Sequence, residues 1–141
     1  MIKTILAAID GSDLSDRVIE TINELKLEAD SKIILVHVIL TLGNEAEITA
    51  DRPQNYAEEI PFRHIEKQLQ TYQTNFSCTS DIEIVSGDPA EEIVRLANIY
   101  HVDLIVIGSR GLTGFKKIVE GSVSSQVVEN SHCSVLVVKP T

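Results

Sequence analysis

The sequence contains Gly108-Ser109-Arg110-Gly111, then nine residues, then Gly121-Ser122-Val123-Ser124-Ser125. The residues before it, Leu104-Ile105-Val106-Ile107, are apolar and mostly β-branched, as is typical of a buried parallel strand. Glycine at the end of such a strand lets backbone N–H groups approach an anion closely. Gly121 precedes a predicted helix start, whose free N–H groups and positive dipole end suit a phosphate. The stretch therefore predicts a phosphate-binding loop between a strand and a helix.

Two other glycine motifs do not fit this stretch. A P-loop requires glycine, four residues and Gly-Lys-Ser/Thr, which the sequence lacks. A dinucleotide fingerprint follows the first strand, whereas these glycines follow the last strand but one, at positions 108, 111, 114 and 121. A glycine-rich turn that binds nothing is the third interpretation, and the complete spacing with Gly-Ser at its far end favours a ligand instead.

Length and composition indicate a single domain spanning residues 1–141. Of the 141 residues, 43% are hydrophobic and 23% are charged, which is ordinary for a globular domain. The apolar runs are far shorter than the roughly 20 residues of a membrane span, and the N-terminus resembles a strand rather than a signal peptide. We therefore expect a cytoplasmic protein without a membrane partner. Cys78 and Cys133 lack metal or disulfide spacing and are expected to be reduced packing residues.

The charge of the chain restricts its ligands. A net charge of −9 and a pI near 4.8 argue against a nucleic-acid partner, because phosphate backbones are bound by clustered Lys and Arg. A single nucleotide needs only backbone amides and one or two local cations. An acidic protein can therefore bind ATP without contradiction.

Strand and helix patterns alternate along the whole chain. Apolar runs predict strands over 2–9, 33–39, 104–107 and 135–138, and polar–apolar alternation predicts a half-exposed edge strand over 81–85. Helical spacing of apolar residues predicts helices over about 13–27, 61–75, from 89 onward, and through 127–128. The fold class that follows is α/β, a single-domain, open, five-stranded parallel sheet of Rossmann-like form with helices on both faces.

Several local features refine this prediction. Ser12 and Asp88-Pro89 are typical helix starts, and Pro61 is expected in the first turn of its helix. The segment Leu42–Glu59 has no clean periodicity and several acidic residues, so we expect a long connection there. His37 interrupts an apolar strand; a metal or catalytic role is one interpretation, but a hydrogen-bonded core or sheet-end histidine is the more common one.

Three predicted strands end at residues that suit a ligand. Asp10, Val38 and Gly108 all fall at the carboxyl ends of strands. Ligands of open parallel sheets bind at this edge, where the strand order reverses. We therefore expect these three residues to lie close to one site.

The glycine spacing resembles the nucleotide-binding signature of the universal stress protein family, which is Gly-x-x-Gly, nine residues, Gly-Ser/Thr. The resemblance extends from Ile5-Leu6-Ala7-Ala8-Ile9-Asp10-Gly11-Ser12 to the last strand, where Ser134 stands in place of the usual proline. It implies a fold of the adenine-nucleotide-binding type and a stress-response regulatory protein with ATP as ligand. AMP or a cyclic nucleotide is the alternative ligand.

The resemblance also implies roles for individual residues. Asp10 would bond the ribose hydroxyls or lie near a nucleotide-bound Mg²⁺, and Val38 would meet adenine through its backbone. The other implied nucleotide-binding residues are Ala8, Gly108, Arg110, Gly111, Gly121, Ser122, Val123 and Ser124. For Asp10 the competing interpretation is a helix-capping carboxylate, and for Arg110 it is a solvated surface residue.

The sequence favours a binding protein over an enzyme. Nucleotide-cleaving relatives of this architecture need a Ser-Gly-Gly-x-Asp-Ser type loop, and Ile9–Asp13 lacks the paired glycines. No Cys/His or Ser/His/Asp arrangement is evident, and a phosphoacceptor domain would need aspartate where Gly108 stands. Slow ATP hydrolysis is the enzymatic alternative to pure binding.

The last predicted strand indicates how the chain associates. Val135–Val138 is apolar on both faces, and no later element of the sequence can pair its outer side. An unpaired apolar edge invites another strand, and the family resemblance also implies dimers of this kind. We expect a homodimer through this strand; a last strand shielded by helices and by residues 139–141 is the alternative.

Overall fold

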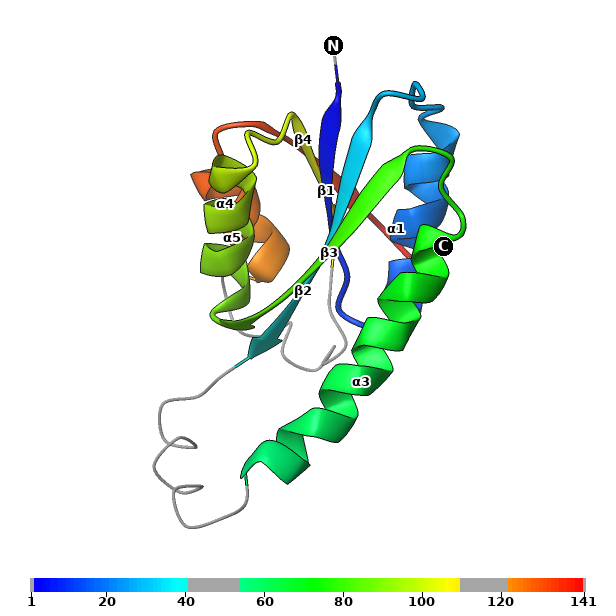
Figure 1. Ribbon diagram of the computed structural model, residues 1–141. Helices are drawn as coiled ribbons and strands as arrows, with labels where there is room; N and C mark the ends of the chain where they lie inside the picture. The colour runs from blue at the N-terminus through cyan, green and yellow to red at the C-terminus, as the bar shows by residue number, and fades with distance from the viewer. Residues whose placement is uncertain (1, 41–53, 110–121, 141) are drawn as a thin grey trace.

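A computed structural model describes residues 2–40, 54–109 and 122–140, with side chains from residue 62 onward in the second segment. Five strands form one parallel sheet in the order β3-β2-β1-β4-β5, which confirms the predicted fold class (Figure 1). The strands are β1 (Thr4–Ala8), β2 (Lys32–Leu40), β3 (Thr79–Gly87), β4 (Leu104–Gly108) and β5 (Ser134–Val138). The helices are α1 (Asp13–Glu24), α3 (Gln54–Gln73), α4 (Pro89–Ile99) and α5 (Val123–Asn130).

The central strand of the sheet is β1. The chain adds β2 and β3 on one side of it and then returns to add β4 and β5 on the other. Ala8, the last residue of β1, pairs with Val36 of β2 and Ile107 of β4. The strand order thus reverses between β1 and β4, which is where ligands of open α/β sheets bind.

Helices cover both faces of this sheet (Figure 1), and an apolar core lies between the helices and each face. Successive residues of β2 alternate between them: Ile33 and Leu35 pack with α1 and α3, whereas Ile34 and Val36 pack with α4 and α5. This alternation is the normal geometry of a strand. Burial of both faces explains why the central strands read as unbroken apolar runs.

The two edge strands are those that the sequence predicts. β3 occupies one edge, its outer side pairs with no described strand, and all of its residues are exposed or half-buried. β5 occupies the other edge and pairs with β4 from Leu104–Ser134 to Gly108–Val138. β3 is longer than the predicted 81–85, since pairing with β2 continues from Thr79 to Gly87.

Two helices have different limits from those predicted. α3 begins at Gln54 rather than Pro61, so Pro61 lies inside the helix and not in its first turn. A proline removes one N–H, but residues 54–60 include strong helix formers that extend the helix beyond it. The predicted connection Leu42–Glu59 is therefore helical from residue 54, and 42–53 lie outside the described residues. α1 ends at Glu24, because Lys26 has a positive φ of 53° that a helix cannot continue.

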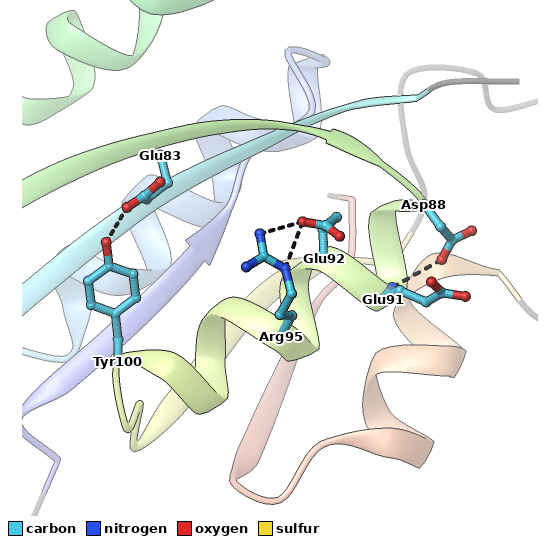
Figure 2. Close-up of polar contacts among 6 residues, drawn as sticks. All are labelled: Glu83, Asp88, Glu91, Glu92, Arg95 and Tyr100. Carbon is cyan, nitrogen blue, oxygen red and sulfur yellow. Dashed lines mark hydrogen bonds and ion pairs between the residues drawn. The ribbon is translucent and has the colours of Figure 1, made fainter. Parts of the chain in front are cut away.

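Polar contacts fix both ends of α4 (Figure 2). Asp88 is the N-cap, as predicted, and its Oδ2 accepts a hydrogen bond of 3.0 Å from the backbone N–H of Glu91, with Pro89 in the first turn. Just after the helix, the hydroxyl of Tyr100 donates to the carboxylate of Glu83 in β3. The cap fixes the start of α4, and the Tyr100–Glu83 bond joins the residue after its end to β3.

Candidate functional site

Four predicted site residues lie at the carboxyl edge of the sheet. Ala8 and Gly108 end β1 and β4, and Asp10 follows β1 by two residues. Val38 lies in β2, two residues beyond the pairing of Ala8 with Val36. Ala8 and Val38 both pack at the margin of the α4–α5 core, so their side chains are on one face of the sheet. The structure thus places these four residues around the point where the strand order reverses.

The carboxylate of Asp10 organises the turn after β1. Its Oδ1 accepts hydrogen bonds from the N–H of Ser12 at 2.9 Å, the hydroxyl of Ser12 at 2.7 Å and the hydroxyl of Ser15 at 3.1 Å. Ser12 is the N-cap of α1, as predicted, but its side chain makes no cap hydrogen bond: its hydroxyl donates to Asp10, and the N–H of Ser15 donates to the backbone carbonyl of Ser12 at 3.0 Å. No described residue donates to Oδ2 of Asp10. One carboxylate oxygen therefore builds the turn, and the other has capacity for a ligand.

Gly11 lies in this turn, where α3 faces it, and its backbone conformation is one that favours glycine. It has a positive φ of 88°, and its N–H donates to the Ser15 hydroxyl at 3.1 Å. A Cβ at this position would lie 3.7 Å from both Oε1 of Gln68 and Cδ1 of Ile65 on α3. A side chain here would be strained by the backbone conformation. Ser15 and Gln68 are neighbours of the site that the sequence did not reveal, since only the fold brings them to Gly11.

Hydrogen bonds of Tyr72 join α3 to α1. The hydroxyl of Tyr72 donates to Oδ1 of Asp16 at 2.7 Å and accepts from Nε2 of Gln68 at 3.2 Å. Burial of the ring, followed by the hydrogen bond to Asp16, raises the pKa of Tyr72 to about 12. Tyr72 lies in the helix that the sequence predicts over 61–75, and no local pattern indicates Asp16 as its partner.

His37 holds the backbone at the start of the Asp10 turn. Its Nδ1 lies 2.7 Å from the carbonyl oxygen of Ile9. This is the hydrogen-bonded sheet-end histidine that the sequence analysis favoured over a metal or catalytic residue. This hydrogen bond joins β2 to Ile9, the residue that follows β1.

The two ends of the glycine loop meet at the same edge. The N–H of Ser109, directly after β4, donates to the carbonyl oxygen of Val138 at 2.8 Å. Ser124, in the first turn of α5, is buried, and its hydroxyl donates to the carbonyl oxygen of Ser109 at 3.4 Å. The start of α5 therefore lies beside the end of β4.

The N-terminus of α5 presents unpaired amides at this position. Ser122 is the N-cap, and its Oγ accepts from the N–H of Ser125 at 3.4 Å. The first bond along the helix runs from the N–H of Gln126 to the carbonyl of Ser122 at 3.0 Å. The N–H groups of Val123 and Ser124 precede it and have no acceptor within the helix. This is a suitable arrangement for an anion.

The remaining predicted loop residues cannot be placed. Arg110, Gly111 and Gly121 lie outside the described residues, so their roles stay predictions. Among the described residues, no group of three or more His, Cys, Asp and Glu side chains is arranged to hold a metal ion. A single carboxylate such as that of Asp10 suits Mg²⁺ carried by nucleotide phosphates, because Mg²⁺ keeps waters and few protein ligands. No helix in the described segments has the length and apolarity to cross a membrane.

Comparison with known proteins assigns the chain to a family. The sequence model of the universal stress protein family matches residues 1–139. Universal stress protein YxiE of Bacillus subtilis is 31% identical over 152 aligned positions, covering 99% of this chain and 100% of the relative. Universal stress protein MJ0577 of Methanocaldococcus jannaschii is 33% identical, covering 99% of this chain and 96% of the relative. The chain belongs to the universal stress protein family.

Solved structures share the same fold. That of MJ0577 has a TM-score of 0.86 at 30% identity and covers 100% of this chain and 98% of that one. An Arabidopsis thaliana family protein with AMP bound has a TM-score of 0.68 at 24% identity, covering 99% and 92% of the two chains. A universal stress protein in complex with cAMP has a TM-score of 0.68 at 23% identity, covering 98% and 97%.

Proposed function

We propose that the protein binds an adenine nucleotide, with ATP as the first candidate, between the ends of β1 and β4. The observation that carries the proposal is the contact of Ser124 with Ser109, which brings the free amides of α5 beside the end of β4. Asp10 follows the adjacent strand β1 at the same edge. An anion site and a carboxylate on neighbouring strands match the two polar ends of a nucleotide.

The proposed contacts divide between the nucleoside and the phosphates. Oδ2 of Asp10 accepts from the ribose hydroxyls, and the backbone of Val38 beside Ala8 meets adenine. The phosphates lie against the backbone at the start of α5 and against Gly108, Gly111 and Gly121, with Arg110 as an adjacent cation. Mg²⁺, when bound with ATP, would neutralise phosphate charge; Asp10 would hold it in the alternative arrangement, in which its free oxygen faces the metal instead of the ribose.

AMP and a cyclic nucleotide are the second candidate ligands. Two proteins of the same fold were solved with AMP and with cAMP bound. All three nucleotides share the adenosine group that Asp10 and Val38 would recognise, and they differ in the phosphate groups that the glycine loop would meet. The loop is therefore the element that would select among them.

The protein acts as a regulatory binding module rather than an enzyme in this proposal. The described residues supply no general base at the phosphate end of the site, where Ser122, Ser124 and Ser125 are the polar side chains. ATP turnover, if present, should lie far below the ~10 per second typical of dedicated enzymes. Phosphate release at ordinary enzyme rates, lost on mutation of Asp10, would instead favour a dedicated enzyme over a binding module. A stress-linked role in the cytoplasm follows the family.

The proposed assembly is a homodimer through β5. This strand forms one edge of the sheet, and its side chains from Val135 to Val137 are only half-buried in one chain. Two copies related by a twofold axis would pair their open edges and cover these side chains. The arrangement would leave the carboxyl edge of each sheet to its own nucleotide.

Calorimetric titration with ATP, AMP and cAMP, with GTP as the control nucleotide, tests the proposed function. Gly121→Val should weaken binding strongly, because a side chain in a backbone cradle fills the space of a phosphate or strains the loop. Arg110→Ala should weaken it far less, because a single surface cation is screened by salt. Wild-type affinity in a folded Gly121→Val protein would contradict the backbone cradle. Failure of every adenine nucleotide to bind wild type would contradict the function itself.

A further inference from the structure

Both backbone polar groups of Ile9, the residue before Asp10, form hydrogen bonds to β2. β1 ends where Ala8 pairs with Val36, but β2 continues to Leu40. The N–H of Ile9 still donates to the carbonyl oxygen of Val36 at 2.8 Å. Its carbonyl oxygen lies 2.7 Å from Nδ1 of His37. Consecutive residues of β2 thus bind both polar groups of Ile9, one through the backbone and one through a side chain.

The direction of the His37 hydrogen bond is fixed by its acceptor. A carbonyl oxygen can only accept, so Nδ1 of His37 carries the hydrogen. A β-branched residue would suit this strand position but would leave the Ile9 carbonyl without this donor. Histidine therefore has a specific function here, which is to fix the Ile9 peptide relative to β2.

The residues that follow Ile9 and His37 in the chain are those expected to contact the nucleoside. Ile9 directly precedes Asp10, and His37 directly precedes Val38. Oδ1 of Asp10 is engaged with Ser12 and Ser15, so the direction of its free Oδ2 depends on where the backbone turn begins. The His37–Ile9 bond joins the two backbones that would meet ribose and adenine.

We infer that His37 is a positioning residue for the nucleoside part of the ligand: it sets the placement of the Asp10 carboxylate relative to the backbone of Val38. This inference rests on the proposed function. Because it concerns ribose and adenine, loss of the bond should weaken AMP and ATP by the same factor. A residue that acted on the phosphate loop would instead change their ratio.

Two substitutions distinguish the two ring nitrogens. His37→Asn places an amide N–H near the position of Nδ1, whereas His37→Gln places it near Nε2. Loss of one neutral hydrogen bond predicts about tenfold weaker binding of AMP and of ATP to His37→Gln, and less than about threefold for His37→Asn. Calorimetry measures both affinities, at a temperature where circular dichroism shows each variant to be folded.

Combination with Asp10→Ala tests whether His37 acts through Asp10. In the Asp10→Ala background, His37→Gln should weaken binding by less than about twofold, because the carboxylate that it positions is absent. Equal loss in His37→Asn and His37→Gln, the same factor in both backgrounds, or unchanged affinity in His37→Gln would each overturn the inference while leaving nucleotide binding intact. Absence of binding by the wild type would overturn the proposed function, and the role of His37 with it.

Discussion

The hydroxyl of Ser124 lies 3.4 Å from the carbonyl oxygen of Ser109, although fifteen positions separate the two residues in the sequence. Ser124 is buried, and the N–H of Ser109 is bound to Val138 at 2.8 Å. Both ends of the glycine loop are therefore anchored in the core and in the sheet. A loop held at two neighbouring points can present its backbone to a ligand without first ordering its ends, which reduces the entropy lost on binding.

Asp10→Asn separates the structural function of Asp10 from its function in binding. The asparagine oxygen can still accept from Ser12 and Ser15, so the free energy of unfolding should fall by less than about 1 kcal/mol. The amide that replaces Oδ2 cannot accept from ribose, so ATP affinity should fall about tenfold. Denaturation and calorimetry measure the two effects. Asp10→Ala is the control, in which both the free energy of unfolding and the ATP affinity should fall. Wild-type affinity in Asp10→Asn would show that Asp10 does not contact the ligand.

Two buried serines should respond in opposite ways to alanine. Oγ of Ser31 is buried and has no hydrogen-bond partner among the described residues, whereas Oγ of Ser15 donates to Asp10 and accepts from the N–H of Gly11. Both residues are 2% exposed, so they form a matched pair. Ser31→Ala should raise the free energy of unfolding by up to about 1 kcal/mol, and Ser15→Ala should lower it by about 1–3 kcal/mol. Urea denaturation measures both, and the reverse order would contradict the hydrogen-bond assignment.

The fold could be predicted because its signals are local. Buried parallel strands read as β-branched runs, the edge strand β3 alternates, and the Asp88-Pro89 cap follows from two adjacent residues. Strict βα alternation then leaves few topologies, because crossover connections are right-handed. The carboxyl-edge positions of Asp10, Val38 and Gly108 follow directly from that topology.

The parts that could not be predicted depend on tertiary partners. Ser12 looks like an ordinary N-cap, but its hydroxyl donates to Asp10 two residues earlier instead of accepting from a backbone N–H of α1. Pro61 looks like a helix start, because the residues before it have no clean helical periodicity in the sequence, yet the helix begins at Gln54. The approach of Gln68 to Gly11 joins α3 to the turn after β1 and has no local signal.

The raised pKa of Tyr72 predicts a loss of stability in alkali. Its ordinary value is 10.0 and its value in the fold is about 12, so between these pH values the unfolded chain releases a proton that the folded chain retains. Stability is therefore full below pH 10 and falls as pH rises toward 12. Relative to Tyr72→Phe, the wild type should lose about 1–2 kcal/mol over this range, allowing for solvent screening of the hydroxyl.

Urea denaturation of both proteins at several pH values, with ultraviolet titration of tyrosinate, measures this difference. The Phe variant is the matched control, since it keeps the ring and removes only the ionisable hydroxyl. Parallel stability curves for wild type and Tyr72→Phe above pH 10 would contradict the raised pKa.

Val137→Pro should convert the proposed dimer into a folded monomer. Val138 directs its carbonyl toward Ser109, so the N–H of the preceding residue, Val137, points away from β4 to the open edge. Proline there removes an outward donor without breaking the β4–β5 ladder. Val137→Ala is the control for loss of the side chain and should remain dimeric.

Light scattering at tens of micromolar protein gives the oligomeric state, and circular dichroism shows whether each variant is folded. Lysine at Leu136 or Val138 would be a less specific test, because both side chains pack against the α1–α3 core and their replacement would also disturb folding. A monomeric wild type, or a dimer that Val137→Pro leaves intact, would contradict the β5 interface.

The most direct test of nucleotide binding is native mass spectrometry of the protein purified without added nucleotide, followed by identification of the released ligand. We expect a mass increase equal to one adenine nucleotide per chain, with ATP the leading candidate, and its loss in the folded Asp10→Ala variant. A protein that carries no adenine nucleotide, and that gains none when ATP, AMP or cAMP is added at millimolar concentration, would contradict the account.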